Sequence, residues 1–164
     1  MHKLNALWRH IINAAIRIRC ASSGGLLMSG EKDQGRLQQM MAPELRPETF
    51  VYCTFPDFRI PAGIHPICTF REVEGMTAIV ERSQALRAEV PHIFEARLIT
   101  LTVHSSLEAI GFLAMVSANL ARAGIPCNAV AAFHHDHLFI PVDRAREALS
   151  LLEALSQRDA QAAI

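Results

Sequence analysis

Three histidines and an aspartate occupy four consecutive positions inside a segment that otherwise has the character of a β-strand. They are His134, His135, Asp136 and His137, in AFHHDHLFIP (132–141). Imidazole and carboxylate groups could ligate a metal, take part in acid–base chemistry or contact a small polar ligand. The cluster could also be only a polar turn, because aspartate side chains close such turns locally.

A second polar group follows a strand-like segment at His104, Ser105 and Ser106. Ser105-x-x-Glu108 has the spacing of a capping box at a helix start. A helix N-terminus attracts anions, because its first amides lack acceptors and carry partial positive charge. A small zwitterion would therefore suit the site, with its carboxylate on the serines and its amine near Asp136. The residues predicted to contact this ligand are His104, Ser105, Ser106, Leu107, Glu108, Asn128, His134, His135, Asp136 and His137.

Metal binding and catalysis are the competing interpretations of these residues. Adjacent strand residues point to opposite faces, so at most two of the clustered histidines converge easily, with His104 as a third. A zinc site needs three or four converging ligands. For a nucleophile, Ser105 lacks a glycine-rich elbow or an evident oxyanion loop. We predict no catalytic residue, no metal and no cofactor.

Hydrophobic periodicity predicts the elements that position these groups in the second half of the chain. They are strands at 96–104, 125–133 and 138–142, a helix between Ser105 and Gly124, and a last helix capped by Asp143. If Leu138, Ile140 and Val142 face the core, then Thr102, His104, His137 and Phe139 face away from the helices. The first of these helices is almost uncharged, so we expect a second domain or subunit to cover its free side.

The first half gives weaker signals of the same kind. Strands are predicted at 49–55 and within 67–81, where Glu74-Gly75 forms a hairpin turn, and a brief helix at 83–90. The second half alone lacks one strand of a ferredoxin-like βαββαβ unit, which the first half or another chain must supply. We therefore predict an α+β fold of two tandem ferredoxin-like units, with the N-terminal unit degenerate.

Composition excludes several classes of protein. The 164 residues are 51% hydrophobic and carry a formal net charge of zero, so a basic nucleic-acid-binding surface is not expected. The four cysteines show no CxxC spacing, which favours reduced thiols in a cytoplasmic protein. Residues 1–28 have the pattern of a basic amphipathic helix interrupted by Arg9, too short an apolar run to span a membrane. We interpret them as an extension upstream of a second plausible start at Met28.

Four motifs resemble, in order and spacing, a family of short bacterial proteins with tandem ACT-like domains. The motifs are CTFREVEGMT (68–77), LTVHSSLEAIG (101–111), AGIPCN (123–128) and HHDHLFIP (134–141). The resemblance covers about residues 29–157 and implies an extension at 1–28, a degenerate ACT-like half at 29–91, an ACT-like domain at 92–157 and a tail at 158–164. It implies ferredoxin-like modules that bind amino acids or similar small ligands and regulate enzymes. In most ACT domains the loop after the first strand carries an Asp and a Gly, whereas residues 104–108 carry neither, so those ligand contacts do not transfer.

The sequence as a whole predicts a non-enzymatic, amino-acid-binding regulatory protein. Its partner would be a small-molecule ligand, with neither nucleic acid nor membrane involved. Two alternatives stay open. One is a structural oligomerisation module, a homodimer formed through the apolar helix at 109–121. The other is a metal-binding protein centred on the histidines.

Overall fold

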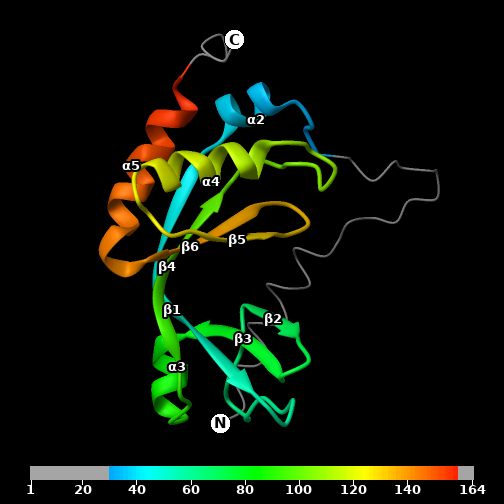
Figure 1. Ribbon diagram of the computed structural model, residues 1–164, viewed down its shortest axis with the longest axis vertical. Coiled ribbons are helices and arrows are strands. Elements are labelled where there is room, and N and C mark those ends of the chain that lie inside the picture. Colours follow the sequence, from blue (N-terminus) through cyan, green and yellow to red (C-terminus); the bar gives the residue numbers. More distant parts are fainter. Residues whose placement is uncertain (1–29, 159–164) are drawn as a thin grey trace, which may run out of the picture.

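The computed structural model describes residues 30–158, so the predictions for residues 1–28 and for the tail beyond residue 158 fall outside the described residues. The elements in chain order are α2 (Gln34–Met40), β1 (Pro43–Phe55), β2 (Cys68–Arg71), β3 (Met76–Glu81), α3 (Arg82–Arg87), β4 (Ile93–Leu101), α4 (Phe112–Arg122), β5 (Asn128–Ala131), β6 (Asp136–Pro141), the short 3-10 helix η1 (Val142–Arg144) and α5 (Ala145–Ser156). One six-stranded antiparallel sheet has the order β2-β3-β1-β4-β6-β5, with helices packed against it (Figure 1). Within residues 30–158 we find no helix with both the length and the apolar character needed to cross a bilayer.

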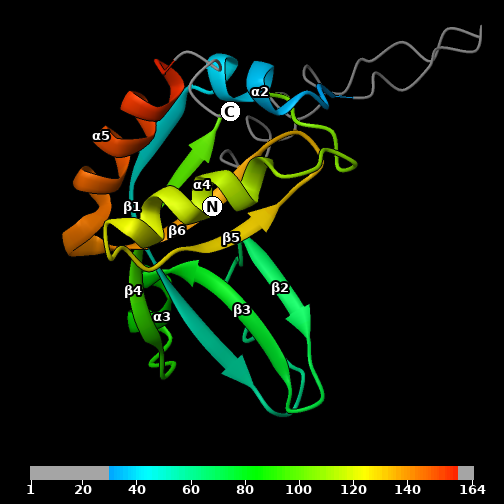
Figure 2. The ribbon, with the colours of Figure 1, turned by 45° about the horizontal axis from the view of Figure 1, so that its top comes forward.

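The two central strands, β1 and β4, belong to both halves of the molecule (Figure 2). The first residues of β1, Pro43–Leu45, pair with Ile99–Leu101, beside β6 and β5. The first residues of β4 pair instead with the later part of β1, beside β3 and β2. Each half thus receives its fourth strand from the other, so of the two predicted sources of the missing strand, the first half and another chain, the first half supplies it.

The pairing of β1 with β4 is interrupted between Leu45 and Thr49. Pro47 lies in this interval and has no backbone N–H to donate to the ladder. The Arg97 guanidinium fills part of the gap, with its Nε donating to the carbonyl of Arg46 at 2.9 Å. Pro43 and Pro47 also explain why only residues 49–55 of β1 were predicted as a strand from the sequence, since proline is uncommon inside strands.

The two hairpins that flank the central strands have the same construction. β2 and β5 each have 4 residues, and β3 and β6 each have 6. Their turns, residues 72–75 and 132–135, close with equivalent bonds, from Glu72 N to Gly75 O (2.9 Å) and from Ala132 N to His135 O (3.1 Å). The N-terminal half has the irregular segment 56–67 where the C-terminal half has α4, so the N-terminal unit is degenerate, as predicted.

Apolar side chains cover the sheet on both faces. On one face of the C-terminal half, α2, α4 and α5 enclose a core that includes Leu37, Leu138 and Leu152. On the other face Phe139 packs edge-to-face against Phe50 and Tyr52, with ring centroids 6.0 and 5.8 Å apart. Pairs of this geometry contribute about 0.5–1.5 kcal/mol beyond their buried area. The predicted orientation of Phe139 away from the helices is confirmed.

The predicted start of the long helix is wrong, because α4 begins at Phe112 and not beside Ser105. The Ser105 hydroxyl donates to Asp136 Oδ2 at 2.7 Å, and its backbone forms a parallel bridge with Glu31. Ser105 therefore cannot cap the helix. Gly111, with φ +87°, is the N-cap residue instead.

Other boundaries in the C-terminal half also differ from prediction. β4 ends at Leu101, because Thr102 turns toward Ala42 and donates to its carbonyl through both N (3.0 Å) and Oγ1 (2.7 Å). Val142 does not face the core but is 41% exposed in η1, since β6 ends at Pro141. Asp143 lies within η1 and does not cap α5. A second domain or subunit was expected to cover the side of α4 that does not face the sheet. Part of that cover comes from the chain itself, because α2 and α5 pack against α4.

Candidate functional site

A small pocket of about 130 Å³ lies between the β4–α4 connection and the β5–β6 hairpin. We call residues 102–111 the pocket loop. The pocket is lined by this loop, by residues 112–114 in the first turn of α4, and by Ala131 and Asp136. Ligand sites for drug-sized molecules measure roughly 300–1,000 Å³, so this pocket suits only a small molecule.

Asp136 provides a buried carboxylate at one wall of the pocket. It is the first residue of β6 and lies on the same face as Leu138, beneath the helices. Asp136 is only 4% exposed, and its partner Ser105 is 6% exposed. An ionised carboxylate has about four lone-pair sites, and a buried one needs partners for its charge. The Ser105 hydroxyl supplies one of them, and a cationic group in the pocket could supply more.

The start of α4 provides partial positive charge, in contrast to the carboxylate of Asp136. The amides of Phe112, Leu113 and Ala114 belong to the first helical turn, where no intrahelical acceptor exists. Gly111 contributes no capping side chain, and these residues line the pocket. The helix macrodipole adds partial positive charge at this end. The structure thus brings a helix start to the pocket, at Phe112 instead of Ser105.

The predicted ligand contacts divide into two sets. Ser105, Ser106, Leu107 and Asp136 line the pocket. The other predicted residues, His104, Glu108, Asn128, His134, His135 and His137, lie outside its lining. Asn128 is exposed on the edge strand β5, and the Glu108 carboxylate pairs with the Lys32 ammonium group.

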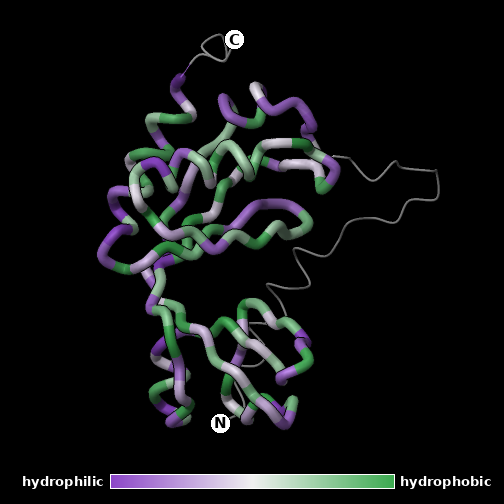
Figure 3. Tube along the Cα trace, viewed as in Figure 1, coloured by the Kyte–Doolittle hydropathy of each residue, from purple (hydrophilic) through white to green (hydrophobic). Residues whose placement is uncertain are grey.

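The histidines form contacts of their own. The rings of His104 and His134 lie 5.4 Å apart, and that of His134 packs edge-on to Phe133 at 4.7 Å. His135 Nδ1 lies 3.3 Å from the carbonyl oxygen of Val103. The β5–β6 hairpin, which contains His134 and His135, carries a hydrophilic run that is visible in Figure 3. In the described part of the chain, no group of three or more His, Cys, Asp or Glu side chains is arranged to hold a metal ion.

His137 lies on the sheet face away from the pocket. It is opposite Thr100 in the β4–β6 pairing, and its Nδ1 is 3.1 Å from Thr100 Oγ1. Burial lowers the pKa of His137, with a further lowering from His135 and Arg46 that outweighs the raising by Asp136. The lowered pKa favours the neutral imidazole, which suits a hydrogen bond with the threonine hydroxyl.

The N-terminal half has no equivalent of this chemistry. Its hairpin places Met76 where the C-terminal hairpin has Asp136, and Met76 packs against the apolar cluster of that half. The segment 56–67 replaces α4, so the helix start is also missing there. The polar pocket is therefore a property of the C-terminal unit.

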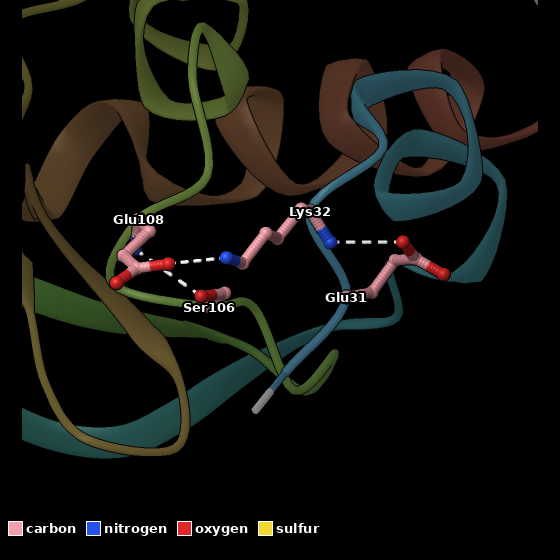
Figure 4. Close-up of polar contacts among 4 residues, drawn as sticks. All are labelled: Glu31, Lys32, Ser106 and Glu108. Carbon is pink, nitrogen blue, oxygen red and sulfur yellow. Dashed lines mark hydrogen bonds and ion pairs between the residues drawn. The ribbon is translucent and has the colours of Figure 1, made fainter. Parts of the chain in front are cut away.

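Sequence reasoning missed two parts of the site. The amides of residues 112–114 were indicated only by Gly111, a residue suited to a left-handed N-cap. Residues 30–34 lie along the outer side of the pocket loop, with Lys32 reaching Glu108 (Figure 4). This contact joins segments far apart in the chain, so no local pattern in the sequence could predict it.

Comparisons with known proteins identify the family. Two family models, each described as an ACT domain, match residues 29–97 and 93–154. The crystal structure of a Vibrio cholerae protein of unknown function, described as a possible transport protein, shares 39% identity. That match covers 74% of this chain and 94% of the other, with a TM-score of 0.66.

More distant structures share the fold. An Agrobacterium tumefaciens protein is 14% identical, with 71% of this chain and 89% of that chain covered and a TM-score of 0.58. The ligand-free regulatory subunit of aspartate kinase from Thermus thermophilus is also 14% identical, with coverage of 69% and 95% and a TM-score of 0.54. A search of curated proteins finds no match. The two family matches and the Vibrio relative show that this chain belongs to the ACT-domain family, with two ferredoxin-like units in tandem.

Proposed function

We propose that the protein is a non-enzymatic regulatory module that binds a small α-amino acid in the pocket of its C-terminal unit. The observation that carries the proposal is the buried Asp136–Ser105 pair, which lines the same pocket as the start of α4, a helix start with no capping side chain. The ligand's ammonium group would lie on Asp136 and its carboxylate on the amides of residues 112–114. A free α-amino acid carries these two charges on groups bonded to the same carbon, and the pocket is lined by both a carboxylate and a helix start.

Size and family membership support the same ligand class. A pocket of about 130 Å³ leaves room for a short side chain, and the apolar groups of Leu107 and Leu113 would contact it. ACT domains are regulatory modules, and a structural neighbour of this chain is a regulatory subunit of aspartate kinase. That similarity supports an allosteric role without naming the regulated enzyme.

The arrangement of the pocket residues argues against catalysis. A serine nucleophile needs a base positioned to take its proton. Here the Ser105 hydroxyl donates to a carboxylate, which is ordinarily a much weaker base than the imidazole of a serine triad, and the nearby histidines lie outside the pocket lining. We therefore propose binding without turnover.

We also propose a cytoplasmic location, on the evidence of the cysteines. Cys53, Cys68 and Cys127 are free thiols in the described part of the chain. Burial raises the pKa of all three thiols, that of Cys127 to about 11, which keeps them protonated and poorly reactive. Reduced thiols of this kind are typical of a reducing compartment.

A thermal-unfolding screen of the twenty common L-amino acids tests the amino-acid proposal. A ligand present at 100 times its Kd stabilises the native state by about 2.7 kcal/mol, so at least one amino acid should raise the Tm clearly. Asp136→Asn, which keeps the shape of the side chain but removes its charge, should abolish this rise. Asp143→Asn is the matched control on exposed η1 and should keep it. The proposal fails if no amino acid raises the Tm, or if Asp136→Asn responds like the natural sequence.

A further inference from the structure

Residues 30–34, which we call the strap, lie directly against the pocket loop (Figure 4). The Glu31 amide donates to the carbonyl of His104, and the Ser106 amide donates to the carbonyl of Glu31, both at 2.9 Å. Together they form a parallel bridge between Glu31 and Ser105. The Lys32 ammonium group then pairs with the Glu108 carboxylate further along the loop.

The close approach of the strap depends on the backbone itself. A Cβ added to Gly30 would lie 2.6 Å from Ser105 C and Ser106 N, and 2.7 Å from His104 O. These are backbone atoms, which cannot rotate aside as the end of a side chain can. Glycine is therefore required at position 30 while the strap is docked.

The strap is fixed to the core at its other end. The Asp33 carboxylate accepts from Arg36 N at 2.8 Å and so caps α2. The next turn of α2 buries Leu37 completely among the helices of the C-terminal unit. The Glu31 carboxylate accepts from the amides of Lys32 and Asp33 at 2.8 and 2.9 Å, which shapes the entry into α2. The strap thus links the core to the wall of the pocket.

Ser105 connects the strap to the pocket in a single residue. Its backbone is held in the bridge with Glu31, and its hydroxyl holds the Asp136 carboxylate. Displacement of the strap would free the backbone of residues 104–106, and with it the position of the hydroxyl on Asp136. Docking of the strap and the shape of the pocket are therefore physically coupled.

We propose that the strap is the regulatory element of the ligand site: its docking preforms the pocket, and ligand binding in turn tightens its docking. The coupling rests on the proposed amino-acid function. Thermodynamic linkage makes it reciprocal, because a strap that raises ligand affinity by a given factor is itself stabilised by the ligand by the same factor.

Amide hydrogen exchange without any ligand tests whether the strap holds the loop. Gly30→Ala should undock the strap and accelerate exchange of the Ser106 amide about tenfold, the effect of losing bonds of this kind. Amides of β3, in the other unit, report any loss of global stability, and the acceleration at Ser106 should exceed theirs. Gly63→Ala is the control, since its added Cβ meets nothing within 4 Å and its strain at φ +89° is remote from the pocket loop. Unchanged Ser106 exchange in Gly30→Ala overturns the proposal.

If Gly30→Ala fails to fold, Lys32→Glu provides the second variant. It replaces the pairing with Glu108 by repulsion at an exposed site, and the double variant Lys32→Glu/Glu108→Lys restores the attraction. Faster Ser106 exchange in the single variant and recovery in the double variant support the proposal. Equal exchange in all three proteins contradicts it.

Isothermal titration with whichever of the twenty L-amino acids raises the Tm tests the coupling. Its Kd should increase in Gly30→Ala. The same amino acid should slow exchange of the Glu31 and Ser106 amides in the natural sequence, by the factor by which the Kd increases when the strap is undocked. An unchanged Kd in the variant overturns the coupling. If no amino acid binds at all, the proposed function fails, and the ligand-free exchange experiment alone decides whether the strap holds the loop.

Discussion

At the level of single residues, Ser105 takes part in two separate interactions. Its side chain supports the Asp136 carboxylate and its backbone joins the strap. Among residues 30–158 these two are the polar side chains buried most fully, and they lie in contact with each other. A carboxylate that is almost buried, has one hydroxyl partner and lines a pocket can accept further hydrogen bonds from a bound ligand. This arrangement favours a ligand with an ammonium group over a neutral one.

His137 makes stability depend on pH. Its pKa is lowered in the folded protein, chiefly by burial, from the ordinary histidine value of about 6.5. Below that value the unfolded chain binds a proton that the folded protein does not accept, so stability falls as the pH decreases through and below about 6.5. The contribution is fully present at higher pH. We expect urea unfolding to show a smaller free energy of unfolding at about pH 5.5 than at about pH 7.5, and the difference to shrink in His137→Gln.

His65→Gln is a suitable control, because His65 is exposed in the segment 56–67. It should keep the pH dependence of the natural sequence. A His137→Gln protein whose stability changes with pH as steeply as before would show that another group is responsible.

At the level of elements, the position of α4 depends on Gly111. Its φ of +87° is strained for other residues, and an added Cβ would lie 2.9 Å from the Gln34 side-chain oxygen. We expect Gly111→Ala to reduce the free energy of unfolding by about 1–2 kcal/mol, the usual penalty of a left-handed conformation, and to weaken ligand binding because the start of α4 moves. Chemical denaturation and ligand titration measure the two effects.

Gly124→Ala is the control that separates the loss of stability from the loss of ligand affinity. Gly124 also has a positive φ, +67°, but nothing lies within 4 Å of its added Cβ, and it follows the far end of α4. It should destabilise the protein similarly while leaving ligand affinity unchanged. Equal losses of affinity in both variants would mean that the start of α4 plays no special part.

The sequence predicted elements well where local chemistry decides them. Glu74-Gly75 marked the first hairpin turn, and the alternation around Leu138 and Phe139 assigned the two faces of the last strand correctly. The helix start failed because the hydroxyl that fits a capping box is bonded to Asp136, a tertiary contact. The strap escaped prediction for the same reason, since its bridge to Ser105 has no local signature.

At the level of the whole molecule, the shared strands make the two units interdependent. Neither unit has four strands without the other, because β1 and β4 run through both. We expect residues 30–158 to unfold in one cooperative transition, with coincident curves from circular dichroism and from hydrogen exchange in each unit. Leu138→Ala in the C-terminal core should reduce the free energy of unfolding by about 2–5 kcal/mol. Amides of β3 that exchange through global unfolding should show the same loss. A β3 transition that stays in place would show that the units unfold separately.

The exchange of half-strands also dictates an order of assembly during synthesis. Of the six strands, β1 leaves the ribosome first, but its opening residues, Pro43–Leu45, have no partner until Ile99–Leu101 follow. The N-terminal hairpin must likewise wait for the first residues of β4 before its sheet is complete. Neither unit can therefore reach its native state on the nascent chain before β4 has emerged. Because the pairing is so distant in sequence, folding should be slow for a domain of this size, and the unpaired edge of β1 is the surface that a chaperone would need to protect in the meantime.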